Sequence, residues 1–113
     1  MSLVFVIGGS SQGKTEYAKR EYPGYFLVDD LELLIRQCLE EGNSVDDMLD
    51  MLLKDLKAKD TVIVCTEVGY GLVPMDAFER MYRETVGRAG QRIAKAAGKV
   101  IRICCGIGTA IKG

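Results

Sequence analysis

Short apolar runs alternate along this chain with segments in which apolar residues recur at helical spacing. The runs at residues 3–7, 25–28, 61–65 and 100–105 are rich in aliphatic residues, as is typical of strands in a buried parallel sheet. Residues 13–21, 31–39, 45–56 and 78–96 instead show the helical spacing, and glycine, proline or serine bounds them. This alternation predicts a three-layer α/β fold with a mainly parallel sheet and right-handed crossovers.

The remaining segments are interpreted as connections within one domain, residues 1–113. Ser44, with Asp47 three residues later, is a plausible N-cap arrangement. Gly69 and Gly71 indicate a loop, and Pro74 suits the entrance to the longest helix. Residues 106–108 are expected to turn the chain toward a short tail. We find no internal repeat, linker or low-complexity segment.

A phosphate-binding loop follows the first predicted strand directly. Residues 8–15 match the pattern G-x-x-x-x-G-K-[ST], in which glycines let successive backbone N–H groups curl around phosphate oxygens. The lysine adds a positive charge, and the final hydroxyl can ligate Mg²⁺ bound with ATP or GTP. The candidate nucleotide-binding residues are Gly8, Gly9, Ser10, Ser11, Gln12, Gly13, Lys14 and Thr15. A glycine-rich turn that matches by chance is the alternative, but the strand before it and the helix-competent segment after it favour a P-loop NTPase-like fold.

Mg²⁺ in such a site needs a carboxylate, normally from the end of another buried strand. Asp29, with Asp30 behind it, follows the second strand, and Glu67 follows the third. The alternatives are a helix N-cap for Asp29 or Asp30 and a solvated loop carboxylate for Glu67. Arg88 and Arg92 share a face of the longest helix and could reach phosphate, although exposed arginines on a long helix are the simpler interpretation.

Composition excludes several classes of function. The net charge is −1 with acidic and basic residues interspersed, so no basic stripe indicates a nucleic-acid partner. No apolar run approaches the roughly 18 residues of a membrane span, and no signal peptide is recognisable, so the expected location is the cytoplasm. The four cysteines form no CxxC pair and are interpreted as reduced core residues. Histidine is absent, which rules out histidine as a nucleophile, general base or metal ligand.

Three further segments resemble one family. Residues 66–74 are similar to the asparagine-glutamate-valine-glycine-x-glycine-(hydrophobic)-valine-proline segment of the adenosylcobinamide kinase/adenosylcobinamide-phosphate guanylyltransferase family. Residues 82–92 resemble its glycine-arginine helix, residues 106–112 its glycine-isoleucine tail, and residues 8–15 its P-loop. Thr66 and Gly90 stand where the family usually has asparagine, and Met75 where it often has glutamate.

The resemblance implies roles for the acidic residues and a set of partners. Asp29 would take the metal-binding position, and Glu67 would position the acceptor hydroxyl or a water near the γ-phosphate, with Lys14 as the second catalytic residue. The implied ligands are Mg²⁺ with ATP or GTP, and a corrinoid, cobinamide, as acceptor. The family also assembles through its helices, so a homo-oligomer is expected.

The resemblance also implies that a stretch between the first helix and the second strand is missing here. In the family that stretch carries the histidine that becomes covalently guanylylated, so guanylyl transfer by that route is excluded. We therefore expect a reduced kinase that transfers the γ-phosphoryl group to a hydroxyl. The alternatives are a non-catalytic nucleotide-binding or regulatory module, and an NTPase that acts on a different partner.

Overall fold

The computed structural model describes residues 2–56, 59–67 and 76–113. Every predicted helix and strand is present, which confirms the α/β fold class. Gly69, Gly71 and Pro74, with most of the 66–74 segment, lie outside the described residues. The elements run in the order β1 (Leu3–Gly8), α1 (Lys14–Glu21), β2 (Phe26–Val28), α2 (Leu31–Glu40), α3 (Val45–Leu56), β3 (Thr61–Thr66), α4 (Ala77–Ala96), β4 (Lys99–Cys104) and β5 (Ile107–Lys112).

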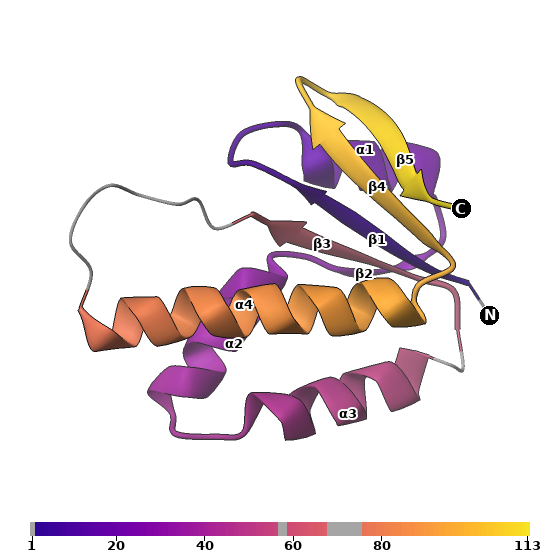
Figure 1. Cartoon of the computed structure of the whole chain (residues 1–113). Helices are drawn as coiled ribbons and strands as arrows, with labels where there is room; N and C mark the ends of the chain where they lie inside the picture. The colour runs from indigo at the N-terminus through magenta and orange to yellow at the C-terminus, as the bar shows by residue number, and fades with distance from the viewer. Residues whose placement is uncertain (1, 57–58, 68–75) are drawn as a thin grey trace.

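The strands form one sheet in the order β2-β3-β1-β4-β5 (Figure 1). The first four strands are parallel, and β5 is antiparallel to β4. β3 therefore lies between the P-loop strand β1 and the strand β2 that leads to Asp29. In the β1–β3 register Gly8 pairs with Thr66, so the predicted phosphate-binding loop begins beside the end of β3.

The expected C-terminal tail is instead the strand β5, so that prediction was wrong. The chain reverses at Cys105 and Gly106, whose φ angles of 52° and 76° are both positive. A two-residue turn with positive φ at both positions matches the twist of a hairpin. The sequence carries cysteine where asparagine or aspartate usually announces such a turn, which explains why the hairpin was not predicted.

Helices cover both faces of the sheet. α1 lies on one face, while α2, α3 and α4 lie on the other (Figure 1). The face under α1 is the smaller cluster, built on alternate residues such as Val6, Val64 and Ile103. The opposite face is the main core, where Phe5 and Ile63 pack against the three helices. None of the described helices is long and apolar enough to cross a membrane.

Local caps fix where two of the helices begin. The Ser44 hydroxyl accepts a hydrogen bond from the Asp47 N–H at 3.2 Å, which confirms the predicted N-cap of α3. Asp76 caps α4 in the same way, through the Glu79 N–H at 2.8 Å.

The four cysteines divide into two classes. All are free, and Cys38 and Cys65 are buried as predicted. Cys104 and Cys105 are exposed, so the prediction of core positions was wrong for this pair. Cys104 occupies an outward position of β4, and Cys105 forms the hairpin turn, where the chain leaves the sheet.

Candidate functional site

The loop between β1 and α1 has the backbone of an anion cradle. Ser11 and Gly13 both have positive φ, at 58° and 82°, and α1 begins immediately afterwards at Lys14. Gly13 is the N-cap and no side chain caps the helix, so its first N–H groups are left for another acceptor. Left-handed turns and helix N-termini both aim N–H groups at anions. At Gly8 a Cβ would lie 2.7 Å from the carbonyl oxygen of Ile103, so only glycine fits there.

The Lys14 side chain crosses this cradle. It is 7% exposed, and its Nζ donates a hydrogen bond to the Gly9 carbonyl oxygen at 2.6 Å. Burying an ammonium group costs free energy unless a partner compensates it. A phosphate group bound in the loop would supply that compensation.

Asp29 faces the first turn of α1. Its Oδ1 accepts hydrogen bonds from the Thr15 hydroxyl at 2.9 Å and from the Asp30 N–H at 2.9 Å. The N-cap of α2 is Asp30, which makes no capping hydrogen bond through its side chain. Asp29 thus approaches the P-loop although β3 separates its strand from β1. A hydroxyl and a carboxylate are the oxygen ligands that Mg²⁺ prefers.

Glu67 is tied to the P-loop by its backbone and turned toward β4 by its side chain. Its N–H donates to the Gly8 carbonyl oxygen at 2.7 Å, and its Oε2 lies 3.3 Å from the Arg102 guanidinium. Within the described part of the chain, the Glu67 carboxylate makes no hydrogen bond or ion pair with Lys14, Thr15 or Asp29. The structure therefore brings Asp29 and Thr15 together but directs Glu67 elsewhere.

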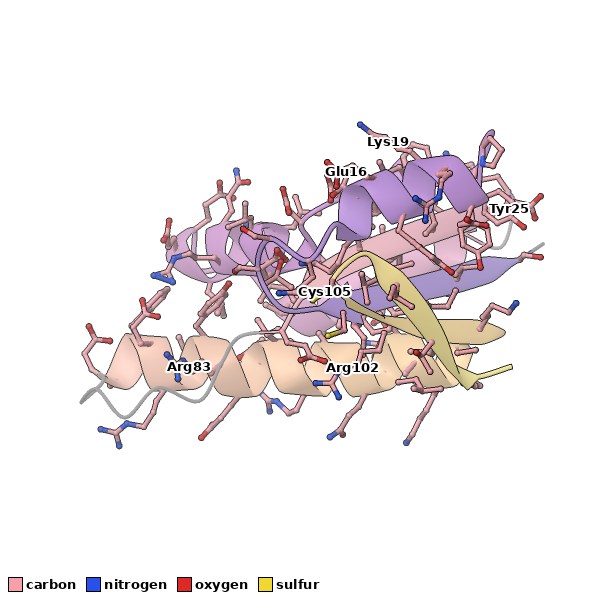
Figure 2. All side chains as sticks on the ribbon, turned by 90° about the horizontal axis from the view of Figure 1, so that it is seen from above. Glu16, Lys19, Tyr25, Arg83, Arg102 and Cys105 are labelled. Carbon is pink, nitrogen blue, oxygen red and sulfur yellow. The ribbon has the colours of Figure 1, made fainter. Side chains whose placement is uncertain are left out.

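Glu67 and Arg102 lie at a cavity of about 630 Å³ between α4 and the sheet. Its walls are mainly apolar, with Phe5 and Ile7 from β1, and Arg83 of α4 adds a second guanidinium. Figure 2 labels both arginines. The cavity borders the P-loop end of β3, since Thr66 also lines it.

The β4–β5 hairpin braces the P-loop from the other side. The Cys105 N–H donates to the Gln12 side-chain oxygen at 2.7 Å, and the Gly106 N–H donates to the Gln12 carbonyl oxygen at 2.9 Å. Figure 2 shows Cys105 at this turn. Because these bonds join positions far apart in the sequence, the motif alone did not indicate them.

Two buried groups near the site are not part of the phosphate cradle. Burial raises the pKa of the Cys65 thiol to about 12, and the Glu32 carboxylate adds to the shift. Cys65 is therefore a neutral thiol at pH 7 and no nucleophile. Glu32 is itself buried, and it was not among the candidate residues predicted from the sequence. The sequence did contain a sign of this burial, because Glu32 stands three residues before Ile35 and therefore on the apolar side of α2.

The two arginines of the long helix that could have reached phosphate are bonded to helix residues instead. Arg92 pairs with Asp46 and Asp50, and Arg88 lies 3.5 Å from the Thr85 hydroxyl. This supports the simpler of the two sequence interpretations.

Comparison with known proteins gives a family match over most of the chain. The model of the family described as "Cobinamide kinase / cobinamide phosphate guanyltransferase" (CobU) matches residues 19–111. The chain is 32% identical over 112 residues to the bifunctional adenosylcobalamin biosynthesis protein CobU of Salmonella typhimurium, covering 98% of this chain and 51% of that protein. It is 43% identical over 51 residues to the protein of the same name from Escherichia coli, covering 45% of this chain and 28% of that protein. The chain thus spans about half the length of the first of these relatives and less of the second.

Proposed function

Because the chain belongs to the cobinamide kinase and cobinamide phosphate guanyltransferase family, we propose that it is a kinase that transfers the γ-phosphoryl group of ATP or GTP to a hydroxyl of a corrinoid, cobinamide. The observation that carries the proposal is the P-loop with its buried Lys14 and its Thr15–Asp29 hydrogen bond. Guanylyl transfer through a histidine is no part of it, since the sequence contains no histidine.

Residues 8–15 bind the triphosphate in this proposal. The N–H groups of the loop and of the α1 N-terminus surround the phosphates, and Lys14 exchanges its hydrogen bond to the Gly9 carbonyl for phosphate oxygens. The hairpin contacts to Gln12 keep the loop in this shape before nucleotide binds.

Thr15 and Asp29 would hold Mg²⁺. Their oxygens lie 2.9 Å apart at the N-terminus of α1, which fits a hydroxyl ligand and an adjacent carboxylate. When bound, the metal supplies charge neutralisation at the β- and γ-phosphates. Asp29 holds the Thr15 side chain in place for that role.

The acceptor would occupy the cavity beside Glu67. An apolar wall with Arg83, Arg102 and Glu67 suits a large ligand that carries both apolar and polar groups. Glu67 would bind the acceptor there, close to the end of β3. Exposed apolar residues on the edge strand β5, Ile107 and Ile111, support the further proposal of a homo-oligomer.

Two substitutions test the nucleotide site. Lys14→Ala should lower the affinity for ATP and GTP by at least about 10-fold with or without Mg²⁺, because a buried cation of the cradle is lost. Asp29→Asn should lower only the part of the nucleotide affinity that depends on Mg²⁺. Titration calorimetry on folded variants measures both, and unchanged affinity in Lys14→Ala would refute the P-loop assignment.

A second assay separates the kinase from its alternatives. The wild-type protein is incubated with labelled ATP or GTP, with and without cobinamide, and both inorganic phosphate and phosphorylated cobinamide are quantified. Transfer to cobinamide supports the kinase, and phosphate release alone indicates an NTPase with another partner. Nucleotide binding without either product would indicate a non-catalytic module.

A further inference from the structure

Glu32, in the first turn of α2, is one of two charged side chains buried among the residues that the structure describes. Glu32 is 6% exposed, and the other is Lys14. Within this described part, Glu32 takes part in no ion pair, although a buried carboxylate without one is costly. Besides burial, both charges act on the thiol of Cys65. Cys65 precedes Thr66, the last residue of β3, so both buried charges act near the P-loop end of that strand.

Two hydrogen bonds, one to its carboxylate and one to its carbonyl oxygen, hold Glu32 at that end. Its Oε2 accepts a hydrogen bond from the Thr66 N–H at 3.2 Å, and Thr66 is the residue that pairs with Gly8. The buried hydroxyl of Tyr82 donates to the Glu32 carbonyl oxygen at 3.0 Å, which anchors the first turn of α2 to α4. The second carboxylate oxygen, Oε1, has no hydrogen-bond partner among the described residues.

The strand order places this carboxylate between the two parts of the nucleotide site. β3 lies between β1, which leads into the P-loop, and β2, which leads to Asp29. Asp29 is engaged with Thr15, and Glu67 with Arg102. Each of these three carboxylates has one oxygen without a hydrogen-bond partner within the described structure, but Glu32 is the one that is buried. Its other oxygen is bonded to Thr66, the strand partner of Gly8.

We propose that Glu32 is the catalytic carboxylate that receives the proton of the acceptor hydroxyl. Its free oxygen accepts a hydrogen bond from that hydroxyl and takes the proton as the hydroxyl oxygen bonds to the γ-phosphorus. The bond from the γ-phosphorus to the β–γ bridging oxygen breaks, and the nucleoside diphosphate leaves with that electron pair. Glu32 then returns the proton to water. The inference rests on the proposed kinase function.

The test compares Glu32→Gln with Glu32→Asp and with Glu40→Gln, an exposed glutamate of the same helix. Glutamine can still accept the Thr66 hydrogen bond but cannot take a proton. Glu32→Gln should lower turnover about 100-fold or more, while nucleotide affinity stays the same or rises up to about 10-fold because a negative charge near the phosphates is gone. Glu32→Asp should recover part of the turnover, and Glu40→Gln should behave as wild type.

Turnover is measured as phosphoryl transfer from labelled ATP or GTP to cobinamide plus release of inorganic phosphate, and affinity by calorimetry. A Glu32→Gln variant whose turnover stays within about 3-fold of the wild-type value would overturn this inference and leave the kinase proposal standing. A Glu32→Gln variant that loses nucleotide affinity and melting temperature together with turnover would overturn the inference in favour of a structural role for Glu32. A wild-type protein that binds nucleotide through Lys14 but shows no turnover would overturn the kinase proposal and this step with it.

Discussion

At the residue scale, position in the sheet decides the chemistry of the cysteines. Cys65 points into the core between β3 and the helices, and burial raises the pKa of its thiol to about 12. Cys104 and Cys105 have the same side chain but lie exposed beside the P-loop. Since the thiolate is the reactive form, exposure and pKa together predict which cysteines react.

We expect iodoacetamide at pH 8 to modify Cys104 and Cys105 and to leave Cys38 and Cys65 intact. A thiol with a pKa near 12 is about 0.01% thiolate at that pH, and burial also blocks the reagent. Addition of Mg²⁺ with ATP or GTP should slow the labelling of Cys105, because its N–H is bonded to Gln12 of the P-loop.

Peptide mapping by mass spectrometry measures these rates, with urea-unfolded protein as the control in which all four cysteines react. Labelling of Cys65 at the same rate in native and unfolded protein would contradict the structure around β3.

At the scale of elements, the β4–β5 hairpin extends the phosphate-binding loop. The loop motif ends at Thr15, yet its middle residue Gln12 is held by two N–H groups from the hairpin turn. Tyr17 of α1 packs against Gly108 of β5, where a Cβ would lie 2.6 Å from the ring. The hairpin therefore contacts both the loop and the helix that are proposed to bind phosphate.

Gly106→Ala tests this link, with Gly24→Ala as its matched control. Both glycines have positive φ, and at both the place that a Cβ would take has no neighbouring atom within 4 Å, so each alanine should cost about 1 kcal/mol of folding free energy. Only Gly106→Ala should also weaken nucleotide binding, by about 3- to 10-fold, because only that turn is bonded to Gln12. Denaturant unfolding and calorimetry measure the two effects, and equal nucleotide affinity in both variants would argue against a bracing role.

At the scale of the whole molecule, one sheet gathers every candidate group at its P-loop end. Helices on both faces bury the strands, and the carboxyl ends of β1, β2 and β3 carry the P-loop, Asp29 and Glu67. Ligands in open α/β sheets bind at this edge. The proposed function uses this edge for phosphoryl transfer supported by carboxylates, and the sequence contains no histidine for a histidine-linked transfer.

We therefore expect no covalent nucleotidyl form of this protein. After incubation with GTP and Mg²⁺ and removal of free nucleotide under denaturing conditions, the intact mass should be unchanged. A family member that retains the guanylylated histidine serves as the positive control. An acid-labile, base-stable increase by the mass of a GMP group would contradict the expectation, since it is characteristic of a phosphoramidate.

The sequence by itself determined the features that depend on neighbouring residues. Apolar spacing predicted each helix and the strands β1 to β4. The glycines, Lys14 and Thr15 of residues 8–15 predicted a phosphate-binding loop, and its phosphate binding stays a prediction. Asp29 was selected because an acidic residue follows a buried strand, and its hydrogen bond with Thr15 places it at the loop. Such patterns are local, since helix and strand periods repeat within a few residues.

Only the tertiary structure decided the features that depend on pairing across the chain. The placement of β3 between β1 and β2, the burial of Glu32 against Thr66, and the direction of Glu67 toward Arg102 each join residues more than 30 positions apart. A carboxylate in the first turn of a helix looks solvated in sequence, and packing of that turn on β3 and Tyr82 is what buries it. The hairpin at Cys105 likewise depends on β5 pairing with β4. A cysteine does not by itself indicate a turn in the sequence, and its positive φ is seen only in the folded chain.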